Sequence, residues 1–74
     1  MNLEADDPLT WDDSYAIARH LLARFPGIDL EQVSLKMIFE WTVALPNFSD
    51  DPQLADNAIL MDIYQEWYEE VNPL

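Results

Sequence analysis

Hydrophobic residues recur at helical spacing in three separate segments of this chain. In the first segment, apolar positions three and four residues apart run from Ile17 to Phe25. Thr10 is expected to cap this helix, because a threonine side chain can accept a hydrogen bond from a backbone amide of the first turn. Pro26 restricts the backbone of the preceding residue and is followed by Gly27, so the helix is expected to end at or before Phe25.

A second helix is expected to end before Pro46. Asp29 and the three residues after it, Leu-Glu-Gln, have the form of a capping box and suggest a short helical turn. The start of the main helix is ambiguous, because Ser34 is a good cap while residues 33–35 also fit a brief extended piece. Apolar positions at helical spacing then continue to Leu45.

The third helix has the clearest pattern, and Asp56 is its expected N-cap. One stripe of the helix is apolar and comprises Ile59, Leu60, Ile63, Tyr64, Trp67 and Val71. With successive residues about 100° apart around the axis, an adjoining arc holds four carboxylates, those of Asp62, Glu66, Glu69 and Glu70. Like charges four residues apart cost about 0.2–0.5 kcal/mol per pair in an exposed helix, and this arc repeats that cost.

The length of 74 residues corresponds to one small domain. We expect an acidic flexible leader at residues 1–8, a single domain at residues 9–71 and a short tail at residues 72–74. The chain has no cysteine, which excludes disulfides, a thiol nucleophile, a thiolate zinc site and a cysteine-ligated iron–sulfur cluster. Neither a signal peptide nor a membrane span is expected, and a cytoplasmic location fits best.

Charge is the strongest feature of the composition. Fifteen acidic residues against 3 basic residues give a net charge of −12 at pH 7. Such a surface repels nucleic acid and anionic lipid, so no nucleic-acid or membrane partner is expected. It attracts a basic protein surface or multivalent cations, although acidity can also serve only to keep a small apolar-rich domain soluble.

Six carboxylates are candidates for weak metal binding, because oxygen ligands suit hard cations. They are the four on the third helix and two in a proline-held turn: Asp50, Asp51, Asp62, Glu66, Glu69 and Glu70. No tightly bound cofactor is expected, and any ferrous or ferric iron should bind weakly. Because Pro52 restricts Asp51 to extended geometry, Asp50 and Asp51 are also candidates for a basic partner. Alternatively, these two side chains only accept hydrogen bonds from backbone amides of the turn.

Several motifs together resemble the IscX family of small acidic accessory proteins in bacterial iron–sulfur cluster assembly. The resemblance extends from about Leu9 to Glu70. It rests on Leu9-Thr10-Trp11-Asp12-Asp13, the helix stop Phe25-Pro26, Asp29 before Val33, Trp41, Phe48-Ser49-Asp50-Asp51-Pro52-Gln53 and Trp67.

The resemblance implies a mainly α, three-helix, winged-helix-like domain, and a short β element stays open. It also implies a non-enzymatic adaptor or regulator that binds a cysteine desulfurase, competes there with bacterial frataxin and binds iron weakly, as an iron-dependent regulator or an iron donor. A monomer is expected. The candidate partner contacts are Asp12, Asp13, Asp50, Asp51, Glu66 and Glu70.

Other classes of function have less support. A chain this short, with 1 glycine and no nucleotide-binding loop, leaves little room for a catalytic cleft, so an enzyme is not expected. An acidic helical carrier or an interaction module unrelated to iron is the alternative, although Asp13-Ser14 is a poor match to a carrier's modified serine. We expect His20 to be an ordinary surface or boundary residue and the three tryptophans to belong to the core.

Overall fold

The structure is a computed structural model that describes residues 7–72. It contains helices α1 (Ser14–Arg24), α2 (Leu35–Val43) and α3 (Asn57–Val71), with single 3-10 turns η2 (Leu30–Gln32) and η3 (Pro52–Leu54) between them. The predicted three-helix, mainly α fold is therefore confirmed. Most of the predicted leader (1–8) and of the tail (72–74) lies outside the described residues.

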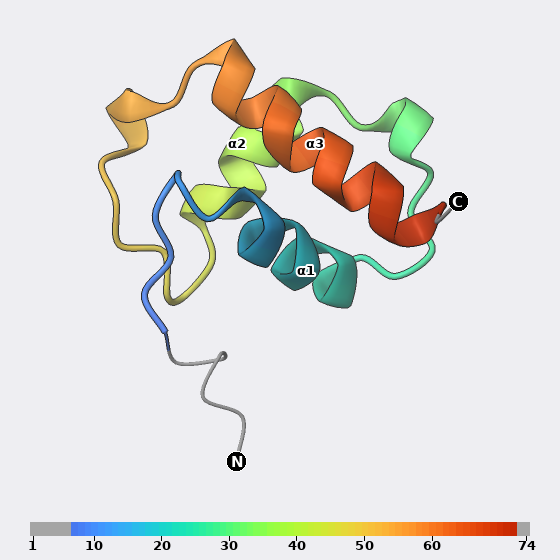
Figure 1. The fold of residues 1–74 in the computed structure, drawn as a ribbon, viewed down its shortest axis with the longest axis horizontal. Helices are drawn as coiled ribbons and strands as arrows, with labels where there is room; N and C mark the ends of the chain where they lie inside the picture. The colour runs from blue at the N-terminus through green and yellow to red at the C-terminus, as the bar shows by residue number, and fades with distance from the viewer. Residues whose placement is uncertain (1–6, 73–74) are drawn as a thin grey trace.

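The three helices are organised around α3. This helix packs against both α1 and α2, which contact each other much less (Figure 1). In the part of the chain described here there is no β-strand, and Leu9 and Phe48 form an isolated parallel bridge. A short β element and a winged-helix-like arrangement are thus not confirmed.

The start of α1 differs from the prediction. The helix begins at Ser14 with Asp13 as its N-cap residue, and no side chain caps it. Thr10 lies one turn earlier, where its carbonyl accepts a hydrogen bond from the Asp13 amide at 3.0 Å. The prediction of Thr10 as cap was wrong because residues 10–13 form a separate turn that places Trp11, only 4% exposed, in the core. The predicted end is confirmed, since Arg24 is the last helical residue.

The start of α2 is settled by Ser34. Its hydroxyl accepts a hydrogen bond from the Met37 amide at 3.1 Å, while the Met37 sulfur accepts one from the Ser34 amide at 3.4 Å. Val33 and Ser34 are extended, so the brief extended piece exists, although Leu35 is already helical. The helix ends at Val43, and Leu45 is buried just beyond it.

The prediction for α3 is confirmed except at its last turn. Asp56 accepts a hydrogen bond from the Ile59 amide at 2.9 Å and caps the helix. Ile63 and Trp67 are fully buried in the core. Val71 is 42% exposed, so its assignment to the apolar stripe was wrong, because the last turn extends beyond the residues that cover the core.

Candidate functional site

The Asp50-Asp51 turn uses its carboxylates within the fold. Asp50 accepts hydrogen bonds from the amides of Trp11 at 3.0 Å and of Asp51 at 2.8 Å. Asp51 accepts one from the Gln53 amide at 2.9 Å and so caps η3. The sequence left open whether these side chains bind a partner or satisfy backbone amides. The second role is present, and a partner contact at Asp50 and Asp51 stays a prediction.

Trp11 ties this turn to the N-terminal segment. Its indole Nε1 donates a hydrogen bond to the Asp51 carbonyl at 2.8 Å. Its ring stacks near Phe39, with centroids 6.0 Å apart, and meets the edge of Phe48 at 4.7 Å. Segments 9–11 and 48–51 therefore behave as one structural unit, and the expectation that Trp11 belongs to the core is confirmed.

Asp12 and Asp13, both predicted partner contacts, differ in their surroundings. The Asp13 carboxylate accepts hydrogen bonds from the Thr10 amide at 3.0 Å and the Thr10 hydroxyl at 3.3 Å. Asp12 is exposed, and its side chain has no hydrogen-bond or ion-pair partner among residues 7–72. Asp12 therefore presents its charge to solvent directly before α1.

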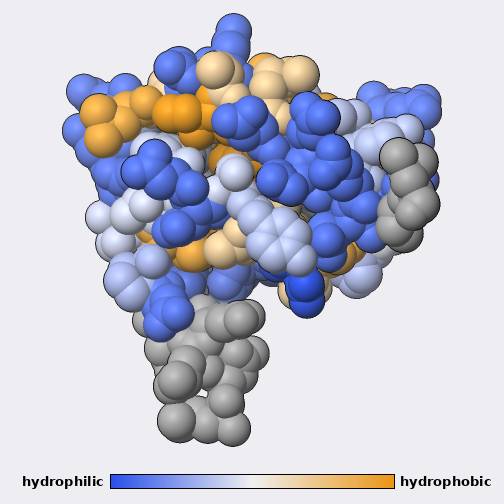
Figure 2. Space-filling model, viewed as in Figure 1, coloured by the Kyte–Doolittle hydropathy of each residue, from blue (hydrophilic) through white to orange (hydrophobic). Residues whose placement is uncertain are grey.

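The carboxylates of α3 gather beside the start of α1. Asp62, Glu66 and Glu69 line a shallow, open depression together with Ser14 and Gln65. Within the described chain, the carboxylates of Asp62 and Glu66 have no hydrogen-bond or ion-pair partner. We call the residues Asp62, Glu66 and Glu69 the acidic face. Hydrophilic side chains cover much of the molecular surface over α1 and α3 (Figure 2).

Glu70 belongs to the same helix but is engaged differently. Its carboxylate lies 3.6 Å from the guanidinium of Arg19. The same guanidinium donates a hydrogen bond to the Tyr15 hydroxyl at 3.2 Å. The Arg19 and Glu70 side chains are 57% and 29% exposed, so solvent screens the pair. Glu70 therefore helps join α1 to α3, and its predicted partner and metal contacts stay predictions.

The six predicted metal ligands do not form one chelating site. Among residues 7–72, no group of three or more His, Asp and Glu side chains is arranged to hold a metal ion. Asp62, Glu66 and Glu69 share one depression, whereas Asp50 and Asp51 cap backbone amides of the turn. Weak metal binding at these residues stays a prediction.

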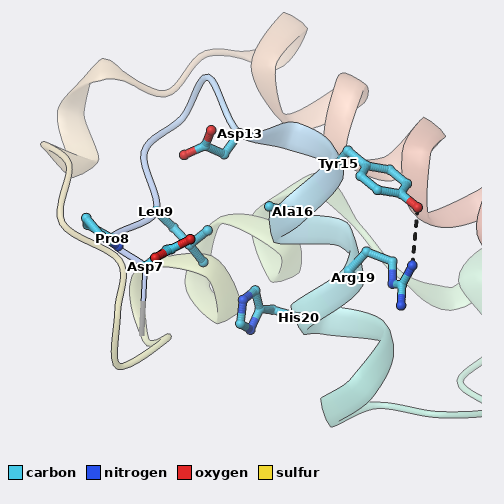
Figure 3. A pocket seen from close by; sticks show the side chains of 8 residues that line it. All are labelled: Asp7, Pro8, Leu9, Asp13, Tyr15, Ala16, Arg19 and His20. Carbon is cyan, nitrogen blue, oxygen red and sulfur yellow. Dashed lines mark hydrogen bonds between the residues drawn. The ribbon is translucent and has the colours of Figure 1, made fainter. Parts of the chain in front are cut away.

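His20 lies at the edge of a groove between α1 and residues 7–9. Figure 3 shows this groove with Tyr15, Arg19 and His20 from α1 and Asp13 at its upper end. His20 is half-buried, which confirms the expectation of a boundary residue.

Helix α3 also carries an apolar surface that its sequence pattern did not predict. Met61 and Tyr68 are 50% and 47% exposed and line a second depression with Tyr64. Met61 lies three residues before Tyr64 and Tyr68 four residues after it, so these two residues widen the predicted apolar stripe on the side of Tyr64. The signal in the sequence was the helical spacing of Met61 and Tyr68 with Tyr64, which predicts an apolar face wider than the stripe that packs in the core.

Comparison with known proteins identifies the family. The model of a family described as "Iron-sulphur cluster assembly" matches residues 9–72. The chain belongs to this iron–sulphur cluster assembly family. The resemblance to the IscX family is thereby confirmed, as is a role in iron–sulphur cluster assembly.

The chain is also similar to a protein of Pseudomonas aeruginosa. It is 39% identical over 62 residues, which cover 84% of this chain and 94% of the relative. That protein is described only as uncharacterized, so it adds nothing about partners. No helix in the described part of this family member has the length and apolar character that crossing a membrane requires.

Proposed function

We propose that this family member is a non-enzymatic adaptor or regulator that binds the cysteine desulfurase of the cluster-assembly system through its acidic face. The observation that carries the proposal is that the carboxylates of Asp62 and Glu66 on the acidic face have no partner among residues 7–72, and neither has that of Asp12. An exposed carboxylate that is not committed to a backbone amide can form a charge-assisted bond with Lys or Arg. Competition with bacterial frataxin for the same basic surface is part of this proposal.

The net charge of −12 supports an electrostatic mode of association. Long-range attraction accelerates the encounter with a basic surface and weakens as salt screens it. The repeated like-charge spacing on α3, with Asp62, Glu66 and Glu70 four residues apart, opposes helix stability slightly. A basic partner would relieve that repulsion on binding.

Iron enters the proposal as a weakly held ion rather than a resident cofactor. The carboxylates of Asp62, Glu66 and Glu69 around one depression offer oxygen ligands and leave room for water. Occupancy by a ferrous ion would neutralise part of the acidic face, which would make desulfurase binding sensitive to iron. In a ferrous titration followed by NMR, we expect perturbations at these three residues, and a flat response would reject the iron component.

The desulfurase proposal is tested with purified desulfurase at two salt concentrations. We expect Glu66→Lys to weaken binding about tenfold at low salt, with a smaller loss at high salt. Glu40→Lys is the charge-matched control: it makes the same change of charge on α2, where Glu40 is exposed and lies 3.9 Å from Lys36, whereas Glu66 is half-buried. No complex of the unmodified chain at low salt would reject the proposal, and equal losses in the two variants would reject the acidic face as the contact.

A further inference from the structure

The acidic face is continuous with the apolar surface of α3. Gln65 and Glu69 line the acidic depression and also the apolar one, which Met61, Tyr64 and Tyr68 complete on the other side. The Gln65 amide donates a hydrogen bond to the Glu69 carboxylate at 3.4 Å. These two side chains therefore form a low ridge between two adjoining depressions on the same helix.

One wall of the apolar depression, the ring of Tyr64, is fixed by a hydrogen bond. The hydroxyl of Tyr64 donates a hydrogen bond to the Leu30 carbonyl at 3.0 Å, which fixes the ring against η2. Tyr68 and Met61 stand about half exposed beside it. A fixed aromatic wall with a flexible thioether next to it is a surface that can accept a bulky apolar side chain at low entropic cost.

The charged residues around this depression are all acidic, which favours a basic partner. Glu69 lies on its rim, and Asp29 and Glu31 line the neighbouring depression on the far side of Tyr68. None of the residues that line either depression is basic. A second copy of this chain would bring the same carboxylates and a net charge of −12, so self-association is opposed. A segment with Lys or Arg beside an apolar residue is complementary.

We infer that the depression of Met61, Tyr64 and Tyr68 receives a bulky apolar side chain from the same basic segment of the desulfurase that covers the acidic face. This inference rests on the proposed function and adds an apolar anchor to it. The acidic face then sets the association rate and the salt dependence, while the anchor contributes affinity that salt does not screen. Tyrosine is among the residues that most often carry such affinity.

The test uses the whole chain, purified desulfurase and two salt concentrations. We expect Tyr68→Gln to weaken binding about tenfold at both concentrations, and Met61→Gln to weaken it about threefold, since an apolar contact is not screened. Leu54→Gln is the matched control, because Leu54 is 59% exposed but lines neither depression. Both α3 positions are solvent-exposed, so the variants should fold, and thermal unfolding of each variant verifies this.

Three outcomes would overturn the inference. If the unmodified chain binds the desulfurase and Tyr68→Gln and Met61→Gln bind equally well, the anchor is rejected while the proposed function stands. If the unmodified chain does not bind, the proposed function and the anchor both fail. If sedimentation instead shows a dimer of this chain that Tyr68→Gln dissociates, a second copy occupies the depression and the inference is wrong.

Discussion

The Asp50-Asp51 turn and the acidic face of α3 both carry carboxylates but use them in opposite ways. In the turn, Asp50 and Asp51 together accept three hydrogen bonds from backbone amides. On α3, Asp62 and Glu66 accept none from the residues that the structure describes. A carboxylate that caps the backbone mainly stabilises the fold, whereas one without an internal partner is available to a ligand. The two regions should therefore respond to mutation in different assays.

The largest stability effect is expected at the anchor of the turn. Trp11→Ala should lower the free energy of unfolding by about 3–5 kcal/mol, because it leaves a cavity beside Phe39 and Phe48. It also removes the indole hydrogen bond to Asp51. Urea denaturation measures the change. A loss below about 1 kcal/mol would contradict the view that the turn is part of the core.

Asp50 should contribute the next largest effect. Asp50→Ala leaves the amides of Trp11 and Asp51 without their acceptor, and should cost about 1–3 kcal/mol in urea denaturation. Asp50→Asn is the control, because its remaining oxygen can accept one of the two bonds and should preserve part of the stability. Equal losses in the two variants would show that charge, rather than hydrogen bonding, matters at this position.

A smaller effect is expected at Asp51. Asp51→Ala should cost about 0.5–1 kcal/mol, since it removes the cap of the single turn η3. Asp51→Asn keeps an acceptor oxygen and should remain close to the unmodified chain in thermal unfolding. If both variants instead lose desulfurase affinity without losing stability, then the turn is a partner contact and the contrast between the two regions is reversed.

On α3 the expected change in stability is smallest and has the opposite sign. The double variant Asp62→Asn, Glu66→Gln removes both like-charge pairs at four-residue spacing, Asp62–Glu66 and Glu66–Glu70. The free energy of unfolding should therefore stay constant or rise by about 0.2–0.5 kcal/mol per pair. Glu40→Gln, which breaks an ion pair of 3.9 Å with Lys36, should lower it slightly. A marked loss in the double variant would reveal a structural role for the acidic face.

Much of the fold could be read from local rules. The helix end before Pro26 and the cap at Asp56 depend only on neighbouring residues, and both are confirmed. The prediction of Thr10 as a cap failed because residues 10–13 instead form a turn that buries Trp11. Trp11 contacts Phe39 and Phe48, which are distant in sequence, so no local rule includes this effect. The burial of Trp11 in the core therefore outweighs the local preference of Thr10 for an N-cap position.

The candidate site was less predictable, for the same physical reason. The sequence placed Asp62, Glu66 and Glu69 on one arc of a helix, and the structure groups them around one depression. The state of Asp50 depends on the amide of Trp11, which is 39 residues away in the chain. Spacing cannot show which carboxylates find an amide across the fold.

Mapping the contact of the isotope-labelled chain with purified desulfurase by NMR at low salt is the most direct test of the central claim. We predict that signals weaken at Asp62, Glu66 and Glu69, with Asp12 also affected, while residues 50–54 remain largely unperturbed. Signal loss centred on residues 50–54, with the α3 carboxylates unchanged, would contradict the assignment of the acidic face as the surface that meets the desulfurase.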